Sequence, residues 1–455
     1  MARRAYGAGG AGPPPGPHFV SGLVRPVSCA SALGEGDGSA AARPGRVHGR
    51  SAEEPQHDRG VIGIDQLSQD ASATLRDLVE SSGTRRVDVV AWRDLDDPEA
   101  GGSELHAHEI LSRWAAAGVD VRLWTSRVDG AARQVERSGY RVTRRAGRYA
   151  VFAATGLDAL RGRLGTGDGV VEIWNGMPFF SPLWARRPRI VFLHHVHAEM
   201  WRMVLPERLA RVGYAIELNL APPLYRRGRV VTLSESSKRE IVERLGFRPD
   251  KVSVAPPGVE ERFTPGGTKS SDPLVLTVGR LVPVKRFDRV IDAMAKLRAD
   301  HPRLEAVVGG EGYERPALEA RVRAAGAGDW LKLPGRVADA DLLALYRRAW
   351  LLVSTSSHEG WGMTITEAAA CGTPAVATRI AGHEDAIVDG VSGTLADTME
   401  DVVTAAGAVL ADDELRARIS RGAIETSRRF SWDATALQAF RALTDQTQGR
   451  AGRGD

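Results

Sequence analysis

From residue 85 onward, short apolar runs alternate with longer stretches in which apolar residues recur at helical spacing. The first runs have the length and the valine and isoleucine content of strands, and they occupy residues 85–93, 170–175, 189–194 and 229–234. The stretch after the first run places four apolar side chains on one helical face: Ala107, Ile110, Leu111 and Trp114. Strands that alternate with helices predict a doubly wound parallel sheet, so the expected fold class is α/β.

The same alternation starts again at residue 273, after a segment rich in Pro, Gly, Ser and Thr. We therefore predict an N-terminal α/β unit, a linker and a C-terminal α/β unit, with bounds 85–258, 259–272 and 273–428. A helix is expected at 429–446, followed by a disordered tail at 447–455.

Residues 1–84 contain few large apolar side chains. Such a segment cannot bury enough surface to offset its ordering entropy, so we expect a disordered or low-complexity extension. Within it, residues 61–80 could form a short helix. An upstream start codon would explain the extension equally well.

Composition narrows the class of protein. A net charge of +4 over 455 residues is too small to indicate nucleic acid binding. The two cysteines, Cys29 and Cys371, lie in unrelated contexts, which favours a reducing compartment over a disulfide or structural zinc framework. No apolar run approaches the roughly 18 residues of a membrane span, and no signal-peptide core is visible, so we expect a cytoplasmic location.

The stretch Ser357–Gly372 combines a strand end, a glycine loop and a helix start. It follows the apolar run at 350–356, and Gly360 and Gly362 allow the backbone to turn sharply and to approach a ligand closely. A helix N-terminus offers free N–H groups and a partial positive charge, which suit phosphate. This order of elements predicts a phosphate-binding turn.

Two carboxylates, Glu359 and Glu367, flank this turn and could reach two parts of one nucleotide with a sugar attached. Their pattern, two glutamates separated by seven residues, resembles family 4 of the retaining GT-B glycosyltransferases. The resemblance implies that Glu359 holds hydroxyls of the donor sugar and that Glu367 holds the nucleotide ribose. Two other interpretations stay open: Thr364 and Glu367 also fit a capping box, and Glu359 could be a solvated loop charge.

The resemblance covers about residues 86–443 and implies the GT-B fold. In that fold two Rossmann-like doubly wound domains face each other across a cleft, and the C-terminal helix crosses back to the first domain. The resemblance also places the turn between the two glutamates in the donor and nucleotide site: Gly360, Trp361, Gly362, Met363 and Thr364. Trp361 departs from the family, which more often has phenylalanine there.

Arg280 follows the first strand of the second unit, and Lys285 lies just before the next helix. The guanidinium fork and the compact ammonium group suit two adjacent phosphates. The pair matches the pyrophosphate-binding residues of the family, so the resemblance implies catalytic roles for both, as for Glu359. With two cations and a helix N-terminus on the diphosphate, neither a metal ion nor another cofactor is expected. The resemblance further implies that Gly309 and the backbone near Val337 border the base.

Three histidines gather where the strand at 189–194 ends: His194, His195 and His197. A zinc site is one interpretation, but no further cluster completes it, so no metal is expected. The family has a histidine at this strand end that reaches the donor sugar, and this role falls on His194, with His195 as the near alternative. A histidine that only packs or caps remains the other interpretation. The resemblance also places Gly102, in the first glycine turn, against donor and acceptor.

Together these features predict a retaining hexosyltransferase. It would move a sugar from GDP-mannose or a UDP-sugar to a glycan, a lipid-linked acceptor or a small molecule. Two alternatives are a non-catalytic module that binds a nucleotide sugar and recruits a partner, and a different reaction on the same fold, such as a nucleotide-sugar epimerase or a phosphorylase.

Eight arginines lie between Arg133 and Arg163, interleaved with apolar residues. Related enzymes dock on anionic bilayers through such surfaces, so a peripheral contact with the inner face of the plasma membrane is a further expected partnership. The alternative is that an arginine-rich sequence places arginines on any solvated face.

Overall fold

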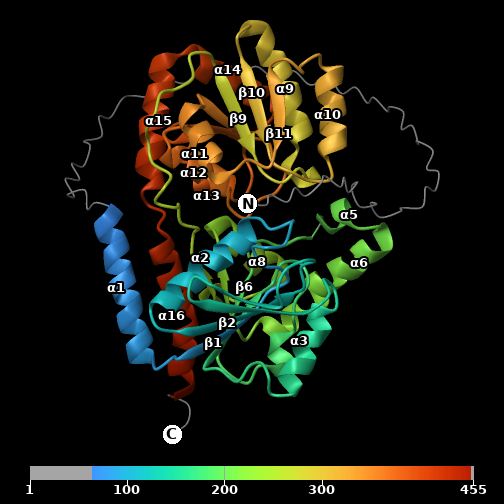
Figure 1. Ribbon diagram of the computed structural model, residues 1–455, viewed down its shortest axis with the longest axis vertical. Coiled ribbons are helices and arrows are strands. Elements are labelled where there is room, and N and C mark those ends of the chain that lie inside the picture. The colour runs from blue at the N-terminus through green and yellow to red at the C-terminus, as the bar shows by residue number, and fades with distance from the viewer. Residues whose placement is uncertain (1–63, 199, 452–455) are drawn as a thin grey trace, which may run out of the picture. The chain divides into compact units, whose positions relative to one another are not determined.

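The structure is a computed structural model that describes residues 64–198 and 200–451 (Figure 1). Most of the expected extension, Cys29 and the end of the expected tail lie outside the described residues. In the described part of the chain, no helix is both long and apolar enough to cross a membrane.

The N-terminal half is built on a sheet of eight strands in the order β3-β4-β2-β1-β5-β6-β7-β8. All neighbours are parallel except β3 and β4, which form an antiparallel pair at one edge that the sequence analysis did not predict. The strands are β1 (Arg86–Val90), β2 (Asp120–Ser126), β3 (Gln134–Arg137), β4 (Tyr140–Ala146), β5 (Gly169–Ile173), β6 (Arg189–Phe192), β7 (Arg229–Thr232) and β8 (Val252–Val254).

The C-terminal half is built on a sheet of six parallel strands in the order β11-β10-β9-β12-β13-β14. The chain winds outward from β9 in one direction and then from β12 in the other, so the strand order reverses between these two neighbours. The strands are β9 (Leu274–Val278), β10 (Glu305–Gly309), β11 (Leu331–Gly335), β12 (Leu351–Ser354), β13 (Ala375–Thr378) and β14 (Gly393–Ala396). The two doubly wound sheets confirm the expected α/β class.

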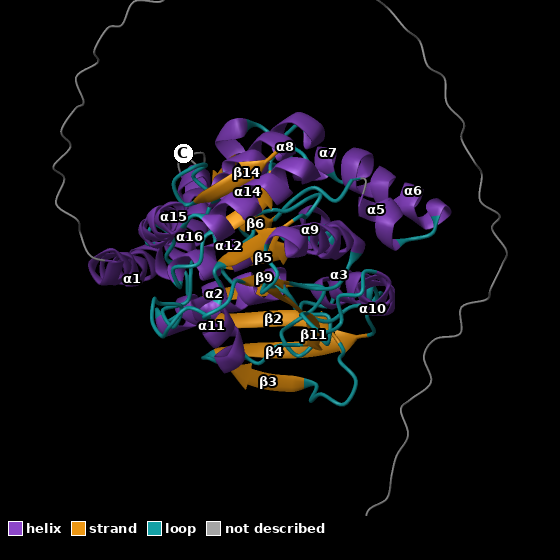
Figure 2. Cartoon of the chain, turned by 90° about the horizontal axis from the view of Figure 1, so that it is seen from above, coloured by secondary structure: helices purple, strands orange, loops and turns teal. Residues whose placement is uncertain are grey.

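Helices flank the strands on both sides (Figure 2), because residues buried on both faces of a parallel sheet need apolar cover. In the N-terminal half these helices are α1 (Ile64–Ser82), α2 (Gly102–Ala116), α3 (Val151–Leu160), α4 (Ser181–Trp184), α5 (Met200–Val204), α6 (Glu207–Ala215), the π-helical η1 (Ile216–Leu220), α7 (Pro222–Tyr225), α8 (Glu235–Leu245) and the 3₁₀ turn η2 (Pro249–Lys251).

The C-terminal half carries a second set of helices around its sheet. They are the 3₁₀ turn η3 (Pro283–Lys285), α9 (Phe287–Asp300), α10 (Arg315–Ala324), α11 (Asp339–Arg348), α12 (Met363–Ala370), α13 (His383–Ala386), α14 (Met399–Ala411) and α15 (Asp413–Ser427). The last helix, α16 (Trp432–Ala451), continues beyond the predicted end at 446.

Helix α16 returns to the N-terminal half, as the resemblance implied. Trp114 of α2 donates a hydrogen bond from Nε1 to the carbonyl of Ala436 at 2.9 Å, and its ring meets Phe440 edge to face. Arg113 pairs with Asp433 at 2.7 Å. These contacts place α16 in the same apolar core as β1, β2 and α2.

Helix α1 confirms the short helix expected at residues 61–80, but it packs on the core instead of belonging to a disordered extension. It lies alongside α16 (Figure 1) and buries Ala71, Leu75 and Val79 in the core of the N-terminal half. Leu75 is only 2% exposed. The three side chains are spaced by four residues, so they lie on one face of the helix. The average composition of residues 1–84 does not show such a face.

The two halves are joined by hydrogen bonds at the start of α8. The carboxylate of Asp385, from α13, accepts hydrogen bonds from the backbone N–H groups of Glu235 and Ser236 at 3.2 and 3.4 Å. The Ser236 hydroxyl also donates to this carboxylate. An acid at a helix N-terminus satisfies free N–H groups, so a C-terminal residue caps an N-terminal helix.

Candidate functional site

The reversal point of the C-terminal sheet collects most of the predicted site residues. Ligands of doubly wound sheets bind at the carboxyl ends of the strands where the order reverses. Arg280 follows β9, and the loop at 355–362 follows β12. The backbone N–H of Ser357 donates to the carbonyl of Val284 at 2.8 Å, which ties this loop to the turn that carries Lys285.

Lys285 and Glu359 contact each other directly. The Lys285 ammonium donates to Glu359 Oε1 at 2.5 Å, and the Ser356 hydroxyl donates to the same oxygen at 2.7 Å. Burial tends to raise the pKa of Glu359, but the charge of Lys285 and these hydrogen bonds lower it overall. Glu359 is therefore an ionised, partnered carboxylate, not a solvated loop charge.

The turn before α12 has the geometry that a phosphate site needs. Gly362 has a φ of 121°, which L side chains rarely adopt, and it caps the helix without any side-chain hydrogen bond. The first N–H groups of α12 are thus not capped by a side chain. Thr364 is not the cap, so the capping-box interpretation of Thr364 and Glu367 is wrong for this helix.

Glu367 instead bonds to a tyrosine. The buried hydroxyl of Tyr346, from α11, donates to Glu367 Oε2 at 2.8 Å. Burial raises the pKa of Glu367 to about 7, although the hydrogen bond from Tyr346 opposes this shift. This carboxyl group can therefore change its protonation near neutral pH.

The first glycine turn of the N-terminal half lies against the same site. A Cβ placed on Gly101 would lie 3.2 Å from Arg280 Nε, and one on Gly102 would lie 3.2 Å from Met363 Sδ. Side chains at these two positions would press on the second half, which is a reason for glycine there. Beside this turn Asn175 donates to the Ser103 hydroxyl at 3.2 Å, so the ends of β1 and β5, where the N-terminal sheet reverses, meet here too.

His194 and His195 face different surroundings. The ring of His194 meets His106 of α2, with 3.2 Å between His194 Nε2 and His106 Nδ1. Burial, followed by the charge of His197, lowers the pKa of His194 to about 4. His195 lies against the glycine loop, because its Nδ1 would be 3.4 Å from a Cβ on Gly360. Both stay candidates for the donor, and His195 is the one whose side chain contacts the loop.

The remaining predicted residues separate into two groups. Gly309 and Val337 come together at the ends of β10 and β11, where a Cβ on Gly309 would lie 3.0 Å from Val337 Cγ2. Trp361 points into the core, is 3% exposed and meets Phe430 edge to face. Its side chain therefore packs, and only its backbone belongs to the turn.

Sequence reasoning missed several polar residues around this site. Tyr346 and Ser356 hold the two glutamates, and a buried acid, Glu217, holds the loop that carries His197. None lies in a recognisable motif. For Glu217, the available signal was an acid within an otherwise apolar stretch.

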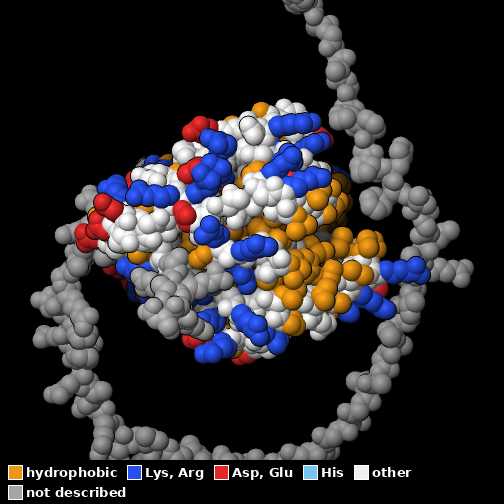
Figure 3. Space-filling model, turned by 90° about the horizontal axis from the view of Figure 1, so that it is seen from below, with side chains coloured by type: hydrophobic (Ala, Val, Ile, Leu, Met, Phe, Trp, Pro, Cys, Tyr) orange, Lys and Arg blue, Asp and Glu red, His pale blue; other side chains and the backbone are white. Residues whose placement is uncertain are grey.

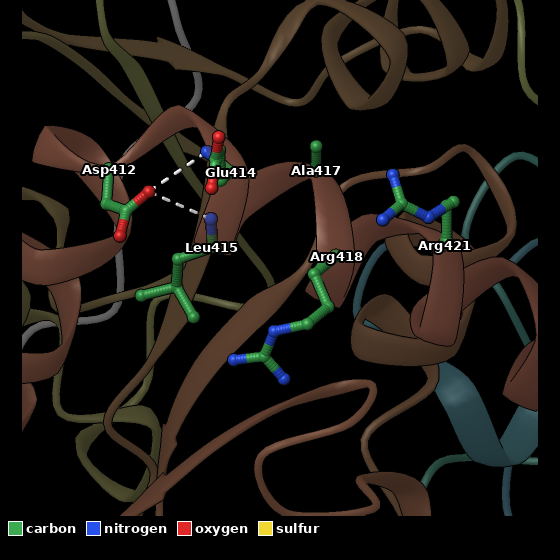
Figure 4. Close-up of a pocket in the computed structure, with 6 residues that line it drawn as sticks. All are labelled: Asp412, Glu414, Leu415, Ala417, Arg418 and Arg421. Carbon is green, nitrogen blue, oxygen red and sulfur yellow. Dashed lines mark hydrogen bonds between the residues drawn. The ribbon is translucent and has the colours of Figure 1, made fainter.

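A hollow of about 470 Å³ on α15 is separate from these residues (Figure 4). Asp412 accepts hydrogen bonds from the backbone N–H groups of Glu414 and Leu415 at 2.9 Å, so it caps the helix. The arginines of this hollow, Arg418 and Arg421, face it from one helix only (Figure 4). It contains none of the predicted site residues.

Two doubly wound sheets that meet at one charged turn, with a last helix that returns to the first sheet, define a GT-B protein. Sucrose-phosphate synthase from Thermosynechococcus elongatus has this fold, with a TM-score of 0.68 at 19% identity over 80% of this chain and 100% of that one. Anabaena Alr3699/HepE, solved in complex with UDP and glucose, matches with a TM-score of 0.62 at 19% identity over 79% of this chain and 100% of that one.

Two family models cover the two halves in turn. The model described as Glycosyltransferase Family 4 matches residues 100–263, and the model described as Glycosyl transferases group 1 matches residues 259–426. The chain belongs to glycosyltransferase family 4. A D-inositol 3-phosphate glycosyltransferase of Acidothermus cellulolyticus is 36% identical over 228 residues, which are 46% of this chain and 51% of that protein. The match thus spans about half the length of that relative.

Proposed function

We propose that the protein is a retaining glycosyltransferase that moves a sugar from a nucleotide diphosphate sugar to a hydroxyl group. The observation that carries this proposal is the convergence of Arg280, Lys285, Glu359 and the start of α12 at the reversal point of the C-terminal sheet, with Gly102 of the other half against it.

Positive charge at this point suits the donor diphosphate. Arg280, Lys285 and the N–H groups at the start of α12 stabilise the negative charge that grows as the sugar–phosphate bond breaks, without a requirement for a metal ion. When the donor binds, its diphosphate replaces Glu359 as the ion-pair partner of Lys285. The Glu359 carboxylate can then accept hydrogen bonds from the sugar hydroxyls. Glu367 accepts hydrogen bonds from the ribose hydroxyls.

Transfer then proceeds on one face of the sugar. The acceptor oxygen bonds to the anomeric carbon as the bond from that carbon to the diphosphate oxygen breaks. The electron pair leaves with the nucleoside diphosphate, and the acceptor proton passes to a diphosphate oxygen. Attack from the face of departure keeps the anomeric configuration. No carboxylate of the set is needed as a nucleophile.

The comparisons suggest which substrates to test first. The structural neighbour HepE was solved with UDP and glucose, which favours a UDP-sugar over GDP-mannose as donor. The matched relatives are named D-inositol 3-phosphate glycosyltransferases, so D-inositol 3-phosphate is the first acceptor to test. Glycan and lipid-linked acceptors are the alternatives.

A binding and turnover panel tests the proposal. A nucleotide at about 100 times its Kd should stabilise the protein by about 2.7 kcal/mol, which a thermal shift detects. UDP-glucose and GDP-mannose are then incubated with and without D-inositol 3-phosphate, and released nucleotide is measured. Binding without any release would indicate a non-catalytic module. An epimerised sugar without release would indicate an epimerase.

We include a peripheral membrane contact in the proposal, but through a different surface from the arginine segment. Five of the eight arginines between residues 133 and 163 pair with carboxylates: Arg137, Arg144, Arg145, Arg148 and Arg163. This pairing favours the interpretation of that segment as an ordinary charged face.

Figure 3 shows hydrophobic side chains gathered on one face with lysines and arginines beside them. The large exposed ones on the neighbouring helices α3, α4, α6, η1 and α7 are Leu157, Leu160, Leu183, Leu209, Val212, Leu220 and Leu224. Co-sedimentation with anionic vesicles, weakened by Leu160→Glu with Leu209→Glu, would support membrane contact. Equal pelleting with neutral vesicles, or none, would remove it.

A further inference from the structure

A buried acid controls the loop that follows β6. Glu217, in the π-helical turn η1, is fully shielded from solvent. Its carboxylate accepts hydrogen bonds from the backbone N–H groups of His197 and Ala198 and from Trp201 Nε1, at 2.8, 2.9 and 2.9 Å. Ala198 has a φ of 39°, a conformation that costs energy in an L residue. Glu217 thus holds a strained loop in one shape.

The same carboxylate lies beside one edge of the His197 ring. Glu217 Oε1 lies 3.4 Å from His197 Nδ1, which is an ion-pair distance without the geometry of a hydrogen bond. Burial tends to raise the pKa of Glu217, but hydrogen bonds and the nearby His197 lower it overall, so the group is an anion. A carboxylate beside Nδ1 favours the tautomer with the proton on that nitrogen. His197 Nε2 then carries a lone pair, and the side chain keeps 17% of its surface exposed.

Other histidine nitrogens around His197 lack protein partners. The ring of His195 stacks on His197 at 4.6 Å and meets His358 edge to face at 5.2 Å. His195 Nε2 is shielded from solvent and has no hydrogen-bond partner, and His358 Nε2 has none either, its nearest acid being Glu240 at 3.9 Å. Buried polar atoms without partners are rare in folded proteins, so these nitrogens are available to a ligand.

The side chains of this cluster are not arranged to bind a metal ion. Among the described residues, no group of three or more His, Cys, Asp or Glu side chains could hold a metal ion. A neutral ligand with hydroxyl groups can serve both kinds of histidine nitrogen, because a hydroxyl donates one hydrogen bond and accepts others.

The loop is also placed beside the proposed donor site. Helix α5, which follows it, packs next to the η3 turn that carries Lys285. His195 touches the loop of Gly360, as described above, and the charge of Arg280 acts on His195. The histidines therefore border the diphosphate residues from the N-terminal side.

We propose that His197, oriented by Glu217, accepts a hydrogen bond at Nε2 from the attacking hydroxyl of a polyol or sugar acceptor, until the departing diphosphate oxygen takes this proton during transfer. This inference rests on the proposed glycosyl transfer. His197 would be in contact with substrate and Glu217 would position it. The interaction holds the acceptor oxygen in line with the anomeric carbon, and misplacement of a reacting atom by about 1 Å can cost a hundredfold in rate.

The test separates acceptor handling from donor binding. His197→Ala should lower nucleotide release from UDP-glucose by about 10²-fold. The loss should appear with D-inositol 3-phosphate as acceptor and with water alone, because water is also an attacking hydroxyl. The Kd for UDP and the Kd for UDP-glucose without acceptor should both stay within about threefold of the wild-type values, since a contact with the donor sugar would change the second one. His197→Gln keeps a polar group near the position of Nε2 and should recover part of the rate.

A matched control addresses structural damage. Glu172 is another fully buried glutamate that anchors a loop, through Phe179 N–H, Ser181 N–H and the Tyr225 hydroxyl, but it touches no histidine. Glu217→Gln should lower nucleotide release without changing the Kd for UDP, whereas Glu172→Gln should lower only the melting temperature.

Unchanged release in His197→Ala would overturn the inference, as would an equal loss of UDP binding. A wild-type protein that binds and cleaves no nucleotide sugar would overturn the proposed function itself, and the inference with it.

Discussion

The end of β6 in the N-terminal sheet and the reversal point of the C-terminal sheet present different chemistries. On the C-terminal side the residues are charged: Lys285 and Glu359 pair with each other, and Arg280 lies against Gly101. After β6, on the N-terminal side, lie His194 and His195, whose pKa values burial lowers. The difference indicates how the two sides of one site can bind different parts of the substrates. Charged groups suit the donor, with cations for its diphosphate and carboxylates for its hydroxyls, whereas neutral imidazoles suit the hydroxyl of an acceptor.

The comparison is tested most strongly at Lys285. Lys285→Ala removes a cation from the charged side and should lower turnover by roughly 10²–10³, as for one donor to a transition-state charge. Lys296→Ala is the matched control, since Lys296 is exposed and pairs with Glu400. Turnover is measured as nucleotide release. Normal turnover in Lys285→Ala would contradict the assignment of the diphosphate to the charged side.

The two glutamates should divide donor recognition between sugar and nucleotide. Glu359→Gln should lower transfer by roughly tenfold or more while the Kd for UDP stays nearly constant, because a hydrogen bond to a charged group contributes about 1.5–3 kcal/mol. Glu367→Gln should weaken binding of UDP itself. Calorimetric titration with UDP distinguishes them, and identical Kd changes in both variants would contradict the assignment.

Through Glu367, a lower pH should increase the stability of the protein and decrease its affinity for UDP. The pKa of Glu367, at about 7, is raised above the ordinary value of a glutamate, so the contribution of this group to stability is present at low pH and is lost as pH rises through 7. The ribose contact needs the carboxylate, so UDP affinity should instead fall below pH 7, by up to about tenfold per pH unit. Thermal shifts of wild type and Glu367→Gln between pH 5.5 and 8.5 measure both slopes. Parallel slopes in the two proteins would assign the pH response to other groups.

The smallest effect on activity is expected far from the charged side, at α1. Leu75→Ala should cost about 2–5 kcal/mol of stability, the usual range for a buried leucine, with little change in nucleotide affinity. The exposed Arg76 provides the control, as Arg76→Ala. A chain that starts at residue 85 should therefore melt at a lower temperature than one that starts at 64. Equal melting temperatures would restore the view that residues 64–84 are dispensable.

Residues on the C-terminal side can be grouped from the sequence more readily than those on the N-terminal side, for a physical reason. Phosphate sites use consecutive residues, so Arg280, Lys285 and the turn at 359–367 can be recognised locally. The contacts on the N-terminal side join distant positions, such as His106 with His194, and Glu217 with His197. No local spacing encodes them.

Contacts with distant parts of the chain also stabilise two elements that local sequence patterns did not predict clearly. The pair β3 and β4 lies in an arginine-rich stretch whose charges suggested a surface, yet Arg144 is buried because Asp94 pairs with it at 2.8 Å. Helix α1 is stabilised by α16, from the other end of the chain.

The place of α16 has a consequence for synthesis on the ribosome. Phe440 and Leu443 belong to the core of the N-terminal half, so that half lacks part of its interior when β8 emerges. About 190 more residues must follow, which takes roughly 10–40 s at ordinary elongation rates. During this interval the surface of Trp114 that Phe440 and Ala436 cover in the folded protein stays exposed. Stalled chains that end before residue 429 should be cleaved by protease within the N-terminal half, and chains released after 451 should resist.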